Sequence, residues 1–140
     1  MSADFFQAII DGDIDAVILN SRREPTILRN DTATDPPHHW IGIRLRGHRT
    51  NRDGVGSRVT VFAGDLRQTA EVHSGRGYQS HFGSRLHFGL AEHDRIDRVE
   101  VRWLGGTTTV HSDIPVDHFV IIEQPIESES ISHKDTKPRR

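Results

Sequence analysis

From Trp40 onward, apolar and polar residues alternate with a period of two, and this alternation constrains the fold more than any other feature of the chain. Ile41, Ile43 and Leu45 share one face of an extended segment, while the residues between them share the other. The same pattern recurs in residues 58–61, 86–90 and 98–103. Such segments are typical of strands with one buried and one solvated face. Because no segment after Pro36 has a helical period, we expect an all-β fold.

Turn-forming residues separate these segments at intervals typical of an antiparallel β-sandwich or a barrel-like domain. The breaks are rich in Gly, Asp or Asn and fall at residues 47–56, 63–65, 74–77 and 104–106. Gly64 and Asp65 predict a hairpin between strands at residues 57–64 and 66–73, because Gly tolerates the positive φ of tight turns. The run from Phe119 to Ile122 is apolar at every position, so we expect a last strand that is buried on both faces and central in its sheet.

Composition divides the chain into three zones. Residues 1–35 are acidic, residues 36–123 are rich in strand patterns, and residues 124–140 are polar and charged. The dipeptide Pro36-Pro37 forces an extended path and marks the entry into the β domain. Since residues 124–140 have few apolar groups to offset their ordering entropy, we expect a disordered tail.

The overall composition excludes several classes of protein. A chain of 140 residues suits one hydrophobic core. Its 18 basic and 20 acidic residues are mixed, so we expect no nucleic-acid partner. The absence of cysteine excludes disulfides and Cys-ligated zinc. We find neither an export signal nor an apolar run that could span a bilayer, so we expect a soluble chain with no membrane partner.

Catalytic and metal-binding motifs do not emerge from the sequence. None of the ten histidines forms a recognised ligand pair, and a site built across strands would draw on His73, His81 and His87. Ser80 is flanked by aromatic residues rather than by the glycines of a nucleophile elbow. We therefore predict no catalytic residue.

Two loops, residues 51–56 and 75–80, are the best candidates for a ligand site, since function concentrates in loops held by a rigid scaffold. The candidate ligand-binding residues are Asn51, Arg52, Asp53, Arg76 and Tyr78. The Tyr78 ring can stack on a sugar while the charged groups supply directional hydrogen bonds. The alternative is structural: Tyr78 packs at a corner of the sandwich and Arg52 pairs with an acid.

The order of these motifs resembles the ASPIC/UnbV domain, best known as the C-terminal module of cartilage acidic protein-like proteins. The motifs are Trp40 to Gly47, Asn51 to Gly56, Gly75 to Ser80, Leu86 to Leu90 and Val99 to Trp103. The resemblance covers about residues 40–123 and departs from the family pattern at Ala91 and at residues 104–106. It implies a module that follows β-propeller repeats in often exported proteins. It implies no catalytic residue for this chain.

The N-terminal zone resembles the closing part of an FG-GAP/VCBS propeller repeat, a family in which an Asp-rich loop binds calcium. Asp11, Asp13 and Asp15 form a degenerate version of that loop. With Gly12 as the turn glycine, the first and third ligand positions fall on Gln7 and Ile9, and isoleucine has no side-chain oxygen. A solvated turn is therefore favoured. We expect no cofactor, with calcium as the remaining candidate.

These features together predict a non-catalytic binding or adhesion module associated with a β-propeller of FG-GAP/VCBS repeats. The alternative is an enzyme or enzyme-accessory domain that acts on carbohydrate or a natural product through the 51–56 and 75–80 loops. The expected partner is a protein, either the propeller repeats or a second copy bound through strands at residues 14–20 and 25–30, and carbohydrate is a further candidate. The resemblance implies a secreted or cell-surface setting.

Overall fold

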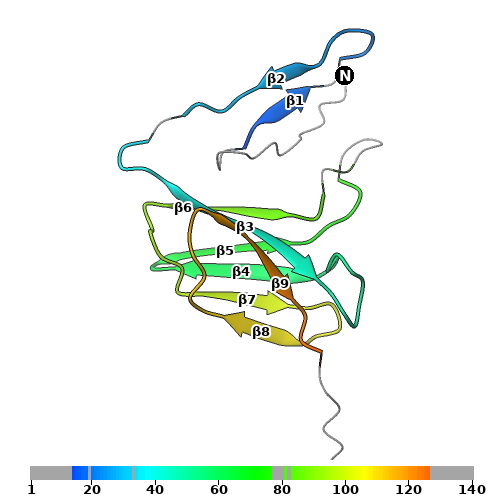
Figure 1. The fold of residues 1–140 in the computed structure, drawn as a ribbon, viewed down its shortest axis with the longest axis vertical. Helices are drawn as coiled ribbons and strands as arrows, with labels where there is room; N and C mark the ends of the chain where they lie inside the picture. The colour runs from blue at the N-terminus through cyan, green and yellow to red at the C-terminus, as the bar shows by residue number, and fades with distance from the viewer. Residues whose placement is uncertain (1–13, 19, 33, 77–80, 82, 127–140) are drawn as a thin grey trace, which may run out of the picture.

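The protein is an all-β sandwich in a computed structural model, which describes residues 14–18, 20–32, 34–76, 81 and 83–126. The described residues contain no helix. The strands are β1 (Ala16–Ile18), β2 (Thr26–Leu28), β3 (His39–Arg46), β4 (Arg58–Ala63), β5 (Leu66–Glu71), β6 (Leu86–Ala91), β7 (Arg98–Arg102), β8 (Thr108–His111) and β9 (His118–Glu123). They form three sheets, and the two larger sheets pack face to face without closing into a barrel (Figure 1). The all-β prediction and the sandwich are confirmed.

The four-stranded sheet has the order β5-β4-β7-β8 and is antiparallel throughout. Its hairpin between β4 and β5 turns at the predicted residues, with Ala63 opposite Leu66 and φ of +57° at Gly64. Glycine at the first of two loop residues suits the right-handed twist of a hairpin. The alternation of Val59 and Val61 with polar neighbours places both valines in the core.

The three-stranded sheet has the order β6-β3-β9, so β3 is its central strand. β6 pairs antiparallel with β3, whereas β9 pairs parallel with it and forms an edge. The prediction of a central last strand is therefore wrong. Ile122 faces the core at 5% exposure, but Phe119 and Ile121 point to the outer side, at 43% and 54%. An apolar run has the same sequence pattern whether its second face meets protein or solvent.

The core lies between the two sheets and draws alternate residues from both. Its largest fully buried side chains include Trp103 and Phe88, from the two sides of the sandwich. The indole Nε1–H of Trp103 donates a hydrogen bond of 3.0 Å to Thr109 Oγ1, which satisfies its polar atom. No buried side-chain nitrogen or oxygen lacks a partner within the described ranges.

The N-terminal strands β1 and β2 pair with each other in a separate two-stranded antiparallel sheet. Within the described residues each strand is the other's partner, and docking of these strands on the sandwich or on another chain stays a prediction. Figure 1 shows this sheet apart from the sandwich, at the top of the view. Ile27 and Leu28 of β2 remain 68% and 52% exposed.

The ordered β domain extends past the predicted boundary at residue 123. Gln124 is only 4% exposed, and its Oε1 accepts hydrogen bonds from the backbone N–H groups of His48 and Arg49, at 3.1 and 3.0 Å. Its own N–H donates to the Arg46 carbonyl at 2.8 Å. Gln124 is therefore part of the fold rather than of the tail. The rest of the predicted tail, residues 127–140, lies outside the described residues.

Candidate functional site

The loop after β3 is closed by the side chain of Asn51. Its Nδ2–H donates to the Val55 carbonyl at 2.9 Å, and its Oδ1 accepts from the Val55 N–H at 2.7 Å. The Asn51 carbonyl also accepts from the Gly54 N–H at 3.1 Å. Asn51, a predicted ligand-binding residue, thus has both ends of its amide bonded within the loop. This residue shapes the site rather than presenting free donors to a ligand.

Gly54 allows the same loop to pack closely against β3. Its φ is +67°, and a Cβ at this position would lie 2.7 Å from the Cβ of Leu45, a buried core residue. A side chain is therefore excluded on both conformational and steric grounds. As a result, the loop residues Arg52 and Asp53 are held beside the end of β3.

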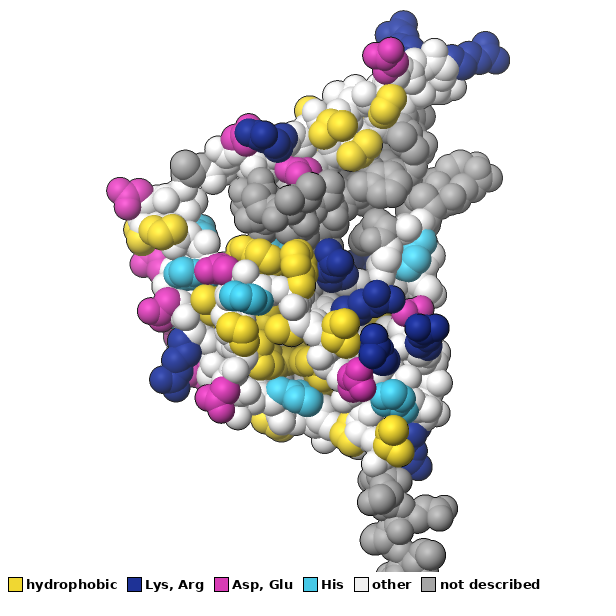
Figure 2. Space-filling view, viewed as in Figure 1, with side chains coloured by type: hydrophobic (Ala, Val, Ile, Leu, Met, Phe, Trp, Pro, Cys, Tyr) yellow, Lys and Arg dark blue, Asp and Glu magenta, His cyan; other side chains and the backbone are white. Residues whose placement is uncertain are grey.

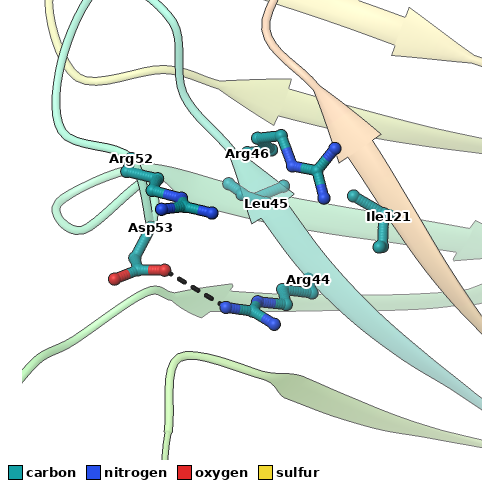
Figure 3. A pocket seen from close by; sticks show the side chains of 6 residues that line it. All are labelled: Arg44, Leu45, Arg46, Arg52, Asp53 and Ile121. Atoms are coloured by element: carbon teal, nitrogen blue, oxygen red, sulfur yellow. Dashed lines mark hydrogen bonds and ion pairs between the residues drawn. The ribbon is translucent and has the colours of Figure 1, made fainter.

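These residues surround a small pocket, which we call the arginine pocket, on the outer face of the three-stranded sheet. It is lined by Arg44, Leu45, Arg46, Arg52, Asp53 and Ile121. Figure 3 shows Arg52 reaching from the loop toward β3, the Arg44 guanidinium beside Asp53, and Arg46 turned toward Ile121 of β9. The cavity volume is about 60 Å³. Of the predicted site residues, Arg52 and Asp53 therefore share a pocket.

Two ion pairs organise the charges of the arginine pocket. Arg44 Nη2 lies 3.4 Å from Asp53 Oδ1, and Arg46 Nη1 lies 2.7 Å from Glu123 Oε1. The other Glu123 oxygen lies 3.3 Å from His48 Nε2. The hydrogen bond to His48, followed by the neighbouring Arg46 guanidinium, holds the pKa of Glu123 below its ordinary value. Glu123 is thus kept ionised, and it restrains Arg46.

The second predicted loop does not join the arginine pocket within the described residues. Arg76 follows Gly75, whose φ is +69°, and it is exposed and absent from the pocket lining. Tyr78 lies outside the described residues, so its predicted stacking on a sugar stays a prediction. The structure therefore brings Arg52 and Asp53 together, with Asn51 in a supporting position.

A wider depression of about 270 Å³ lies at the end of the four-stranded sheet. Its lining comprises Gly56, Arg58, Glu71, Arg102, Trp103, Leu104, Gly105 and Gly106. Arg58 Nη2 lies 3.5 Å from one Glu71 oxygen, and His73 Nδ1 lies 3.8 Å from the other. Because both carboxylate oxygens have partners, Glu71 has an evident structural role in linking strand β4 to the end of β5.

Of the proposed calcium ligands, Asp15 alone lies among the described residues. Asp11 and Asp13 lie outside the described residues, and the Oδ1 of Asp15 accepts a hydrogen bond of 2.8 Å from the Asn30 N–H. Across the described part of the chain, no three His, Asp or Glu side chains gather as a metal site. His87 instead stacks on Trp40, with ring centroids 5.6 Å apart.

Sequence reasoning missed a partly exposed cluster on the outer side of the three-stranded sheet, which we call the aromatic face. It consists of Trp40, Arg85, His87, Phe119 and Ile121. The Trp40 and Phe119 rings lie 4.8 Å apart, and the Arg85 guanidinium carbon lies 4.4 Å above the centre of Phe119. Figure 2 shows hydrophobic side chains gathered in the middle of this view, with basic side chains beside them. The unbroken apolar run of β9 was the signal, and we assigned it to the core.

The described part of the chain contains no apolar helix of membrane-spanning length.

Comparison with known proteins gives one informative result. No curated protein matches the chain. A family model described as ASPIC and UnbV matches residues 47–129, which include the Asn51 loop, both hairpin strands and β9. The match spans more than half of the sequence and agrees with the order of motifs and with the sandwich. The chain therefore belongs to the ASPIC/UnbV family.

Proposed function

We propose that this chain is a non-catalytic binding module that docks on a β-propeller of FG-GAP/VCBS repeats through its aromatic face. The observation that carries the proposal is the exposure of large apolar side chains on the outer side of the three-stranded sheet. Phe119 is 43% exposed and Ile121 is 54% exposed, and they are next-but-one neighbours on the same side of β9. Contiguous apolar side chains on a surface mark interaction sites in soluble proteins.

The composition of the aromatic face matches that of an interface centre. Aromatic residues and arginine supply most of the binding energy in protein interfaces, and Trp40, Phe119 and Arg85 are packed against one another here. Among the described strands, β9 also lies at the edge of its sheet, a position at which other chains can pair. These features support protein binding more strongly than a polar, solvated sheet face would.

The charges around the aromatic face favour an acidic partner. Arg44, Arg46 and Arg52 line the adjoining pocket, and Arg85 stands over Phe119. The N-terminal zone, which resembles part of such a repeat, is acidic, and acidic repeats of this kind complement these arginines. Charge complementarity is therefore the reason for choosing propeller repeats as the partner.

The geometry gives less support to the enzyme alternative. An enzyme site of this kind needs a pocket in which several polar groups converge, including a carboxyl group with a shifted pKa. Asp53, the carboxylate that lines the arginine pocket, is 51% exposed and paired with Arg44. Asn51, two residues before Asp53, is bonded within its own loop. Both residues have structural roles that account for their positions.

The test is calorimetric titration of this chain with a purified β-propeller built of FG-GAP/VCBS repeats. Ile121→Asp should reduce affinity at least about tenfold, because it places a carboxylate in the apolar centre of the interface. Val110→Asp is the matched control, since Val110 is 61% exposed on β8 of the opposite sheet. Cooperative melting of both variants verifies folding. Absence of binding by the unmodified chain, or equal loss in both variants, would refute the proposal.

A further inference from the structure

We propose that the arginine pocket binds one carboxylate group, supplied by an Asp or Glu side chain of the docked protein. The inference deepens the proposed function and rests on it for the identity of the partner. The anion site itself rests on the geometry of Arg44, Arg46 and Arg52 in the free chain.

The backbone places the three arginines around the pocket before any ligand arrives, and ion pairs restrain Arg44 and Arg46. Arg44 and Arg46 are two residues apart on β3 and therefore project from the same face of the sheet. Arg52 comes from the loop that Asn51 and Gly54 fix against β3. Preorganised donors lower the ordering cost of binding. The site is thus built by a strand and a restrained loop together.

The pocket has more positive than negative charge. Three guanidinium groups line it or adjoin it, against the two carboxylates of Asp53 and Glu123. The contact between Arg44 and Asp53, at 3.4 Å, is longer than the about 2.7–2.9 Å of a strong charge-assisted bond. The Arg52 guanidinium has no ion pair or hydrogen-bond partner among the described residues. Arg52 is therefore the cation that a ligand can neutralise.

The charge and geometry of the pocket set the class of ligand. The pocket is small, with a cavity volume of about 60 Å³, and side chains of three arginines line it. Guanidinium forks match carboxylates through paired N–H donors. The lining thus favours a small anionic group that accepts paired hydrogen bonds.

The surroundings favour a protein carboxylate over a polyanionic chain. Ile121 forms one wall of the pocket and continues into the aromatic face through Phe119. A polysulfated glycan or a nucleic acid needs a row of cations, whereas Asp53 and Glu123 interrupt the row here. A protein surface can supply an acidic side chain for the arginine pocket and, next to it, an apolar side chain for the aromatic face.

The anion site is tested in the free chain by titrating acetate and following the arginine Nε–Hε NMR signals. Arg52 and Arg44 should shift and saturate, and sodium chloride at equal ionic strength should not reproduce the effect. Arg67 and Arg98 are internal controls, because both stack on Phe62 of the opposite sheet. Equal shifts at all arginines, or no shift at Arg52, would overturn the inference. A response to a sulfated disaccharide but not to acetate would overturn it in favour of a glycan.

The propeller titration separates this inference from the proposed function. Arg52→Gln should weaken propeller binding at least about tenfold, the usual effect of losing a hydrogen bond between charged groups. Arg67→Gln removes the same charge from the opposite sheet and should change affinity less than about twofold. If the propeller binds both variants equally, the carboxylate site fails and the proposed function stands. If acetate shifts Arg52 but no propeller binds, the proposed function fails and the anion site stands.

Discussion

A single methyl group at Gly54 tests the packing of the loop against the sandwich. Gly54 has φ of +67°, and its Cβ would lie 2.7 Å from the Cβ of Leu45, which is 1% exposed. Gly75 has nearly the same φ, +69°, but a Cβ there meets no atom within 4 Å. The substitutions Gly54→Ala and Gly75→Ala therefore share the backbone strain and differ in the collision with the core.

The size of the difference follows from these two contributions. Left-handed backbone costs an alanine about 1–2 kcal/mol, and the reduced entropy of the unfolded chain returns about 0.4–1 kcal/mol. Gly75→Ala should therefore lower the free energy of unfolding by about 1 kcal/mol. Gly54→Ala adds overpacking of about 1–3 kcal/mol, because Leu45 or the loop must move. We expect Gly54→Ala to be the more destabilising by about 2 kcal/mol.

Urea unfolding of the two variants and the unmodified chain measures this difference. A value of about 2 kcal/mol corresponds to a Tm lower by about 8–16 °C for a domain of this size. The denaturant slope should be unchanged, since the loss arises in the folded state. If Gly54→Ala and Gly75→Ala unfold at the same urea concentration, the loop is not packed on Leu45 as described, and the reasoning about the arginine pocket loses its support.

Three other predictions concern the ends of the domain and its charges. Removal of residues 127–140 should leave the free energy of unfolding unchanged. Gln124→Ala should lower it by about 1–3 kcal/mol, because two N–H groups lose their acceptor. Urea unfolding that shows equal effects for the two changes would contradict this. Because the folded pKa of Glu123 is depressed, its stabilising contribution is present above the ordinary glutamate pKa and is lost as the pH falls through the lowered value. An NMR titration should show a higher Glu123 pKa in His48→Ala than in the unmodified chain, and identical values would exclude His48 as the main cause. Millimolar calcium should change Tm little, because Ile9 at the third ligand position has no side-chain oxygen, and a large rise reversed by chelator would disprove this.

Local patterns were sufficient to predict the strands and the hairpin. The two-residue turn at Gly64 and Asp65 needs only a residue that tolerates positive φ between two extended segments. Ile41, Ile43 and Leu45 are all buried because a strand in a sandwich has one inward face. These properties depend on neighbours in the sequence, so the sequence alone is enough.

Strand order and distant polar contacts could not be predicted in the same way. β9 pairs in parallel with β3, at a sequence separation that no local pattern encodes. Gln124 has the composition of a tail residue, yet it is buried because the loop at residues 48–49 brings two N–H donors to it. The arginine pocket likewise needs β3, a loop and β9 to meet. Its members Arg52 and Asp53 were identified, but Arg44, Arg46 and Ile121 were not.

Phe119 shows how an exposed aromatic ring can still be held in one position. A Cβ at Gly42, directly opposite it on β3, would lie 2.1 Å from Phe119 Cδ1, so the ring lies across the space that glycine leaves. Trp40 and Arg85 contact the same ring. Such a ring loses little conformational freedom when a partner covers it, and this lowers the cost of binding. Gly42 therefore belongs to the proposed docking surface as fully as the aromatic residues, although its contribution is the absence of a side chain.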